Sequence, residues 1–281
     1  MNKKEVIFKI CKEINKETAK KVATIQLKKQ KLNLTDSKLG GIPYLPVDGE
    51  FPVDSDGRQL TLLAQINCED LQGMNDFPHK GLLQFFILMD DCYAYDDDNT
   101  EQNKFRVIYY DEIDENVKEE FLVEKYKPYL EEEYLLPFEG EFKINFEISE
   151  EGMSFEDCKF DEYFVKKYNE LFPQNEIKSF YELDDDDDEE DVFDILDELS
   201  EEVSGQGNKV GGYPYFTQSD PRKFEDCSAY DILLLQIDTT DDDDEGVHIM
   251  WGDSGVCNFF INSDRLKNLD FSDVLYNWDC C

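Results

Sequence analysis

Basic residues are scarce in this sequence. It holds 28 Lys and Arg against 67 Asp and Glu, which gives a formal net charge of −39 at pH 7. Proteins that bind nucleic-acid backbones or anionic membrane surfaces do so through clustered Lys and Arg, so we expect neither kind of partner. A basic protein fits the charge better. The simpler alternative is that the acidic groups only keep a cytoplasmic protein in solution.

The residue patterns that bind transition metals or form disulfide frameworks are missing as well. His79 and His248 have no second His and no suitably spaced Cys nearby. The eight Cys residues include no CxxC pair and follow no regular spacing. We therefore predict no metal site and no cofactor, and we expect reduced thiols, most of them buried. The Cys residues are Cys11, Cys68, Cys92, Cys158, Cys227, Cys257, Cys280 and Cys281.

Long apolar runs are also absent. Lys9 and Lys12 interrupt the first apolar run, which is atypical of a secretory signal. No later segment approaches the ~20 apolar residues that a membrane-spanning helix needs. The pattern predicts a cytoplasmic protein.

Aromatic residues, in contrast, are abundant. The 281 residues include 21 Phe and 15 Tyr, a content that a disordered acidic chain would not have. We expect one compact body over residues 1–281, whose oligomeric state the sequence does not reveal. Its expected parts are a basic helical region over 1–36, a repeat unit over 37–150, a helical and acidic connector over 151–208, and a second repeat unit over 209–281.

The first 36 residues hold ten Lys and only four acidic residues. Val6, Ile7, Ile10 and Ile14 recur at helical spacing, which predicts an amphipathic helix from residue 4 to about 30 with at most one break. We expect its apolar face to pack on the protein's own core. A membrane-surface or partner-binding helix is the alternative, disfavoured because the acidic remainder would be repelled by anionic lipid.

Four segments have the composition of β-strands. Residues 60–66 and 82–89 are apolar runs bounded by turn-forming residues, typical of strands buried on both faces, and 105–110 is similar. Residues 142–148 alternate strictly between apolar and polar side chains, as in a half-exposed antiparallel strand. The pattern predicts a mostly antiparallel sheet.

Helical spacing returns after residue 155. Residues 160–172 place Phe164, Tyr168 and Phe172 on one face. The segment 182–202 contains no base: its first half, Asp184 to Asp188, is expected to be a solvated loop. Its second half has enough apolar residues for a short acidic helix.

One phrase occurs twice. KLGGIPY, from Lys38, returns as KVGGYPY, from Lys209, an offset of 171 that holds as far as Gln65 and Gln236. GLLQFFI (81–87) then matches GVCNFFI (255–261) at an offset of 174. We infer an internal duplication: two copies of one β-unit, related by a pseudo-two-fold axis or sharing a sheet, with peripheral helices. The predicted fold class is a β-dominated α+β fold.

The repeated residues have structural interpretations. The Gly-Gly pairs at 40–41 and 211–212 permit positive φ before an extended segment that contains Pro. Gln65 and Gln236 need hydrogen-bond partners if they are buried, which a core network would supply. The alternative is that they line a cleft between the two units together with Tyr44 and Tyr215.

The segments SKLGGIPYLP, LLAQINCEDL and GLLQFFI, with KVGGYPYFTQSDPR, LLLQID and WGDSGVCNFFI, resemble the YwqG-like family, a bacterial domain of unknown function. The resemblance covers most of residues 5–281. It implies a duplicated β-dominated fold and no established activity, cofactor or functional residue. Genes of this family often stand beside toxin and immunity genes, which implies a protective binding role.

Three kinds of segment resemble known catalytic or binding motifs, but their spacing or surroundings do not fit those functions. GDSG at 252–255 matches the nucleophile loop of trypsin-like proteases, but no base held by a third group accompanies Ser254, and we predict a tight turn. GQGNKVGG at 205–212 lacks the dinucleotide-binding spacing. The acidic runs at 96–98, 184–191 and 241–245 do not match a calcium loop.

The sequence therefore names no reaction. We expect a cytoplasmic, non-enzymatic protein whose acidic surface binds a basic protein, in the manner of an immunity protein. The alternative is a small-molecule binder or enzyme that uses a cleft between the two repeat units.

Overall fold

The computed structural model describes residues 2–96, 98–131, 137–184, 191–199, 203–223 and 226–281. Ten strands form one sheet in the order β12-β11-β8-β7-β1-β6-β2-β3-β4-β5. Every pairing between these strands is antiparallel, so the fold is a β-dominated α+β fold, as expected. The strands are β1 (Lys20–Lys28), β2 (Lys38–Gly40), β3 (Thr61–Asn67), β4 (Leu82–Ile87), β5 (Phe105–Tyr110), β6 (Glu141–Glu151), β7 (Lys209–Gly211), β8 (Ile232–Asp238), β11 (Val256–Ile261) and β12 (Val274–Asp279).

The four strands predicted from composition are confirmed as β3, β4, β5 and β6. All six residues of β4 are buried, as are five of the seven in β3. The alternation in β6 also holds at its start, where Phe142 and Ile144 are buried. These apolar runs form strands that are buried on both faces, because other elements cover both sides of the sheet.

The two ends of the sheet pack against each other. The rings of Phe85 on β4 and Phe259 on β11 lie 5.1 Å apart, and Phe105 on β5 stacks on Tyr276 of β12 at 5.2 Å. The Tyr276 hydroxyl also donates to the Tyr93 carbonyl (2.6 Å). These contacts belong to the main hydrophobic core, which lies between the β4–β5 end and the β11–β12 end.

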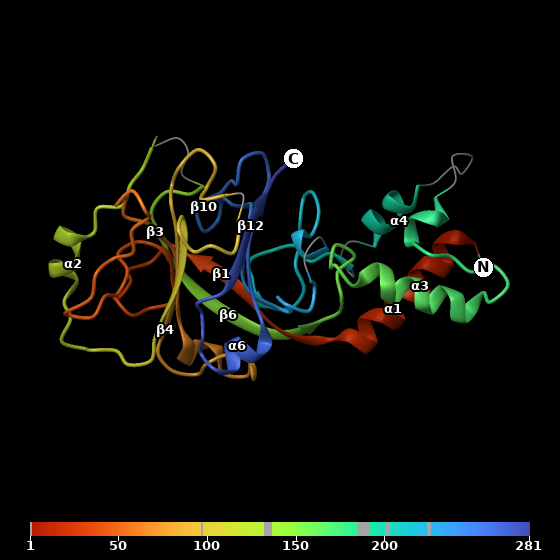
Figure 1. Cartoon of the computed structure of the whole chain (residues 1–281), viewed down its shortest axis with the longest axis horizontal. Helices are drawn as coiled ribbons and strands as arrows, with labels where there is room; N and C mark the ends of the chain where they lie inside the picture. The colour runs from red at the N-terminus through yellow and green to blue at the C-terminus, as the bar shows by residue number, and fades with distance from the viewer. Residues whose placement is uncertain (1, 97, 132–136, 185–190, 200–202, 224–225) are drawn as a thin grey trace.

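A second hydrophobic cluster lies among the helices on one side of the molecule (Figure 1). It is formed chiefly by α1 (Lys3–Thr18), α3 (Phe160–Leu171), α4 (Val192–Glu198) and the 3₁₀ turn η3 (Phe180–Leu183). Strands β1 and β6 run from the sheet toward these helices (Figure 1). The remaining helical elements are η1 (Cys68–Leu71), α2 (Glu119–Lys125), η4 (Pro221–Lys223) and α6 (Ser263–Lys267).

Helix α1 packs on the protein's own core, which confirms that prediction. Asn2 and Glu5 form a capping box at its start. Ile7, Ile10 and Ile14 are fully buried in the helical cluster. None of the described helices combines the length and the apolar character needed to cross a bilayer.

The predicted extent of this first helix is wrong. The helix ends at Thr18, and Lys20–Lys28 form strand β1, paired with β6 along its whole length. The β-branched residues Val22, Thr24 and Ile25 favour an extended chain. The buried positions Ile25 and Leu27 alternate with exposed ones, a period of two that the Lys-rich composition obscured.

The predicted helices over residues 160–172 and in the second half of the acidic segment are confirmed as α3 and α4. Val192, Ile195 and Leu196 of α4 are buried in the helical cluster. Of the predicted acidic loop Asp184 to Asp188, residues 185–188 lie outside the described residues.

Candidate functional site

Gln65 and Tyr44, predicted as possible cleft residues, are parts of one buried hydrogen-bond network. The Gln65 Oε1 atom accepts from the Tyr44 backbone N–H (3.0 Å) and from Gln84 Nε2 (2.8 Å). Its Nε2 atom donates to the carbonyls of Leu34 and Asp36. All four hydrogen-bonding positions of this amide are thus used inside the protein.

Gln236 and Tyr215, the other two predicted residues, make corresponding contacts. The Gln236 Oε1 atom accepts from the Tyr215 backbone N–H (2.8 Å), and its Nε2 atom donates to the carbonyls of Gly205 and Gly207. Asn258 donates to the Tyr215 carbonyl. Gln65 lies on β3 and Gln236 on β8, and in the sheet order β2, β6, β1 and β7 lie between these two strands. The two networks are therefore separate: Gln65 bonds with Tyr44, and Gln236 bonds with Tyr215. A ligand-binding role for these four residues stays a prediction.

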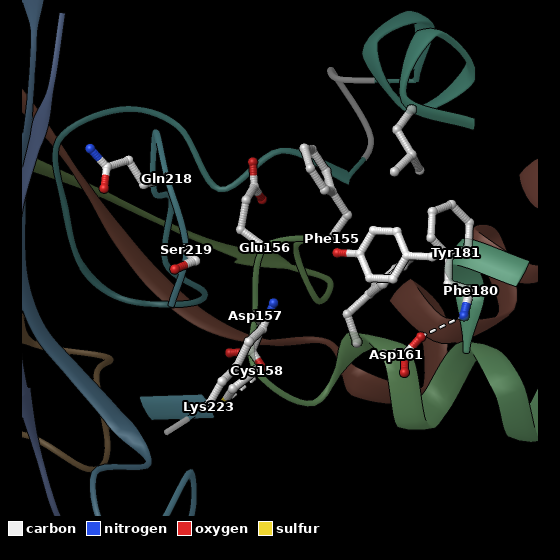
Figure 2. A pocket seen from close by; sticks show the side chains of 12 residues that line it. Phe155, Glu156, Asp157, Cys158, Asp161, Phe180, Tyr181, Gln218, Ser219 and Lys223 are labelled. Atoms are coloured by element: carbon white, nitrogen blue, oxygen red, sulfur yellow. Dashed lines mark hydrogen bonds between the residues drawn. The ribbon is translucent and has the colours of Figure 1, made fainter. Parts of the chain in front are cut away.

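A cavity of about 300 Å³ lies where the helical cluster meets the loop before β8 (Figure 2). Three stretches of chain line it: the turn before α3, the helical cluster and the loop at 218–223. In Figure 2, Glu156 stands between the Gln218–Ser219 loop and the aromatic rings. The lining residues are Phe155, Glu156, Asp157, Cys158, Phe160, Asp161, Phe180, Tyr181, Leu196, Gln218, Ser219 and Lys223.

Glu156 is the unusual residue of this cavity. Both of its carboxylate oxygens are shielded from solvent, and neither has a hydrogen-bond partner of ordinary geometry. Burial raises the pKa of Glu156 to about 8. Nearby backbone N–H groups, the charge of Lys209 and the Ser154 hydroxyl offset only part of that rise. At neutral pH the side chain is therefore mainly protonated.

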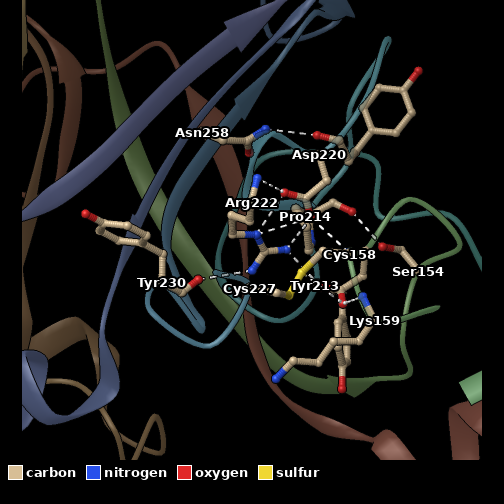
Figure 3. Close-up of polar contacts among 12 residues, drawn as sticks. Ser154, Cys158, Lys159, Tyr213, Pro214, Asp220, Arg222, Cys227, Tyr230 and Asn258 are labelled. Carbon is tan, nitrogen blue, oxygen red and sulfur yellow. Dashed lines mark hydrogen bonds and ion pairs between the residues drawn. A yellow bond between two sulfur atoms is a disulfide. The ribbon is translucent and has the colours of Figure 1, made fainter. Parts of the chain in front are cut away.

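A buried ion network is centred on Arg222 and Asp220 (Figure 3), and it also holds Asp157. Arg222, only 3% exposed, donates from Nη2 to Asp157 Oδ2 (2.9 Å) and to Asp220 Oδ2 (2.6 Å). Its Nη1 donates to the Tyr230 carbonyl, and its guanidinium lies 4.3 Å from the Phe260 ring. Buried carboxylates need such partners, so this network fixes the turn before α3 against the loop before β8.

Cys158 and Cys227 form a disulfide beside this network, with their Cα atoms 6.2 Å apart. The expectation of reduced thiols is therefore wrong for this pair. The two residues are 69 positions apart, and spacing alone could not reveal that the fold brings them together. Among the remaining Cys residues, Cys11, Cys68 and Cys257 are buried.

The third acid of the cavity, Asp161, caps the start of η3. Its Oδ1 atom accepts from the Phe180 backbone N–H (2.6 Å) and the Ser179 hydroxyl (3.2 Å). Asp157 and Asp161 therefore already have partners within the protein. Among the described acids that line the cavity, Glu156 is the one whose carboxylate oxygens have no hydrogen-bond partner of ordinary geometry.

A second acidic feature is the hairpin of β9 (Thr240–Asp242) and β10 (Val247–Ile249). Asp241 to Asp244 are exposed, and His248 Nδ1 lies 2.6 Å from Asp241 Oδ1. Asp242 accepts from the backbone N–H groups of Asp244 and Glu245, which fixes the turn. A cavity of about 340 Å³ lies between this hairpin and β1.

The GDSG motif forms the predicted tight turn between β10 and β11, with positive φ at Gly252 (54°) and Ser254 (59°). The Ser254 N–H points to Met250 Sδ. His79 instead contacts the Met74 carbonyl. The structure therefore gives this serine a role in the turn.

The model of one protein family, described as a domain of unknown function (DUF1963), matches residues 37–280. The chain belongs to this family. The DUF1963 match includes nearly all of the sheet, the lining of the 300 Å³ cavity and the acidic hairpin, but it begins after α1 and β1. A comparison with curated proteins found no match.

Sequence reasoning missed Glu156 and Arg222. One acid among 67 gives no signal of its own, because burial without a partner is a property of the fold. Arg222 had a weak signal: it is a rare Arg in the DUF1963 segment SDPRKF, directly after an Asp-Pro turn.

Proposed function

We propose that this protein is a cytoplasmic, non-enzymatic, YwqG-like binding protein built from two copies of one β-unit, and that its acidic surface binds a basic protein in the manner of an immunity protein. The observation that carries the proposal is the ordered β9–β10 hairpin, which presents consecutive exposed carboxylates.

Matching hydrogen bonds support the duplication. The bonds of Gln65 to the carbonyls of Leu34 and Asp36 recur, at an offset of 171, as bonds of Gln236 to Gly205 and Gly207. The sheet order supports it too, because β2-β3-β4-β5 and β7-β8-β11-β12 extend outward from the central pair β1–β6. Phe85 and Phe259, equivalent at the later offset of 174, contact each other, as residues near a pseudo-two-fold axis do.

The hairpin holds its charges close together. Asp241 and Asp243 are exposed, and their described cationic contact is His248. The Oε1 atom of Glu245 lies 3.9 Å from Lys28 Nζ. Like charges fixed on an ordered turn repel each other, and a basic partner relieves that repulsion.

The adjoining cavity offers a place for a partner side chain. Ile25, Leu27 and Val247 supply apolar wall, and Asp242 and Glu245 lie at its acidic side. Lys28 also lines the cavity. Apolar side chains beside acidic ones suit the long side chains of Lys and Arg, whose stems are apolar.

The test compares two triple variants with the same net charge. Asp241→Asn/Asp243→Asn/Asp244→Asn neutralises the hairpin, and Glu112→Gln/Glu115→Gln/Glu120→Gln neutralises three exposed acids elsewhere. Asp242 is left intact because it caps the turn. The measurements are the affinity for a fluorescent octalysine peptide and the capture of a partner from native-host lysate.

We expect the hairpin variant to lose at least fivefold in peptide affinity and to lose the captured partner, while the control loses less than twofold. Raising the salt to about 0.5 M should release the partner from the wild type, because the screening length is then only a few ångströms. Equal losses in both variants, or no partner at low salt, would contradict the proposal.

A further inference from the structure

The 300 Å³ cavity contains a carboxylate that the rest of the protein does not explain. Both Glu156 oxygens are shielded from solvent and have no hydrogen-bond partner of ordinary geometry, whereas buried polar groups are nearly always paired. Its two acidic neighbours in the lining, Asp157 and Asp161, are occupied by Arg222 and by the start of η3. A hydrogen-bond donor placed beside the Glu156 carboxylate would therefore be strongly stabilised.

The surrounding wall is apolar. Phe155, Phe160, Phe180, Tyr181 and Leu196 line the side formed by the helical cluster and the turn before it. A volume of about 300 Å³ is at the lower end of the ~300–1,000 Å³ range of ligand pockets. The space therefore suits a small group with an apolar stem, and the aromatic faces favour a cation.

We propose that this cavity binds a primary ammonium or guanidinium group on a short apolar stem, with Glu156 as its counter-charge. Glu156 is one of the lining residues while both of its carboxylate oxygens are shielded from solvent, so binding requires the carboxylate to turn toward the ligand. The group can belong to a free small amine or to a Lys or Arg side chain of a protein. The site is separate from the β9–β10 hairpin and does not depend on it.

Binding at this site has a proton signature. Glu156, with a pKa near 8, is mostly protonated at pH 7 and must ionise to pair with a cation. Binding at pH 7 should then release roughly 0.9 proton per ligand. Six titratable or charged groups face Glu156 or share its cavity: Lys209 and Tyr215 toward the sheet, and Asp157, Asp161, Tyr181 and Lys223 around the cavity.

Lys209 does not already serve as the counter-charge of Glu156. Its Nζ donates to both carboxylate oxygens of Glu151, at 3.0 and 3.1 Å. The exposed Lys223 at the cavity adds a repulsive charge for a cationic ligand. Lys223→Met should therefore raise the affinity for a cation, whereas it would lower the affinity for an anion.

The experiment is calorimetric titration of the full chain at pH 7, in two buffers of different ionisation enthalpy. The probes are n-butylammonium and n-butylguanidinium, with n-pentanol as the neutral control of similar size. A capped Ala-Lys-Ala peptide, with norleucine replacing lysine in its control, distinguishes a protein-borne group from a free amine. Glu156→Gln is the test variant, and exposed Glu162→Gln on α3 is its matched control.

We expect millimolar or tighter binding of at least one cationic probe, with about 0.9 proton released, and no binding of pentanol or of the norleucine peptide. Glu156→Gln should abolish the proton release and weaken binding at least tenfold, while Glu162→Gln changes neither. Absence of binding, equal binding of pentanol, or binding unaltered in a folded Glu156→Gln protein would each overturn the inference. The hairpin variants test the proposed function separately, because they leave this cavity intact.

Discussion

Replacing Glu156 by Gln should stabilise the protein, and the gain should grow with pH. The folded chain binds the Glu156 proton up to about pH 8, whereas the ordinary pKa is 4.5. Between these values the folded state holds more protons than the unfolded state, so its stability falls as pH rises. Each pH unit in this interval costs about 1.4 kcal/mol, which amounts to about 3 kcal/mol at pH 7. Gln retains the shape and removes the ionisation.

Urea unfolding at pH 5, 7 and 8.5 measures the difference between the two proteins. We expect a gain for Glu156→Gln of less than 1 kcal/mol at pH 5, about 3 kcal/mol at pH 7 and more at pH 8.5. Glu162→Gln should show no such trend, because Glu162 is exposed on α3. A gain that stays constant or declines over this pH range would refute the reasoning.

Three further predictions concern the stability of the fold. Gln65→Ala and Gln236→Ala should each cost about 2–4 kcal/mol in urea unfolding, because each strands several buried hydrogen-bonding groups. Arg222→Met should cost about 3–5 kcal/mol in urea unfolding at pH 7, since it leaves the buried carboxylates of Asp157 and Asp220 without their ion-pair partner. Dithiothreitol should lower the melting temperature because it breaks the Cys158–Cys227 disulfide. In the chain-entropy model, closing a loop of this length stabilises the folded protein by about 4 kcal/mol.

Each of these three predictions has a control. Gln174→Ala, at an exposed position, should change stability by less than 0.5 kcal/mol. Arg265→Met removes a half-exposed ion pair and should cost about 1 kcal/mol or less. A Cys158→Ser/Cys227→Ser protein should not respond to dithiothreitol. If a control changes stability as much as its test variant does, the corresponding argument fails. The argument for the two Gln networks also fails if Gln65→Ala and Gln236→Ala differ widely in their loss of stability.

Local patterns predicted much of the sheet. The apolar runs of β3 and β4 are buried because sheet faces are covered on both sides. The Gly pairs have the predicted positive φ, 68° and 76° at Gly40 and Gly41, and 72° and 70° at Gly211 and Gly212. At Gly40 a Cβ atom would lie 2.6 Å from the Gly140 carbonyl oxygen, so only Gly fits there.

The features that the sequence did not predict depend on contacts between residues that are far apart in the chain. The Lys-rich strand β1 is extended because β6 and β7 supply partners on both of its edges. The candidate cavity combines residues near positions 156, 180 and 219, which no local period connects. The burial that raises the pKa of Glu156 therefore had no signature in its own neighbourhood of the sequence.

Strand β1 has a further consequence for how the chain is made. It is translated before both of its partner strands, and Val22 pairs with both Ser149 on β6 and Gly211 on β7. At translation speeds of about 5–20 residues per second, β1 waits roughly 10–40 s for its second neighbour. During that interval its unpaired edges are open to wrong partners. The Lys side chains at its two ends, Lys20, Lys21 and Lys28, are the kind of charge that keeps an unpaired strand from aggregating.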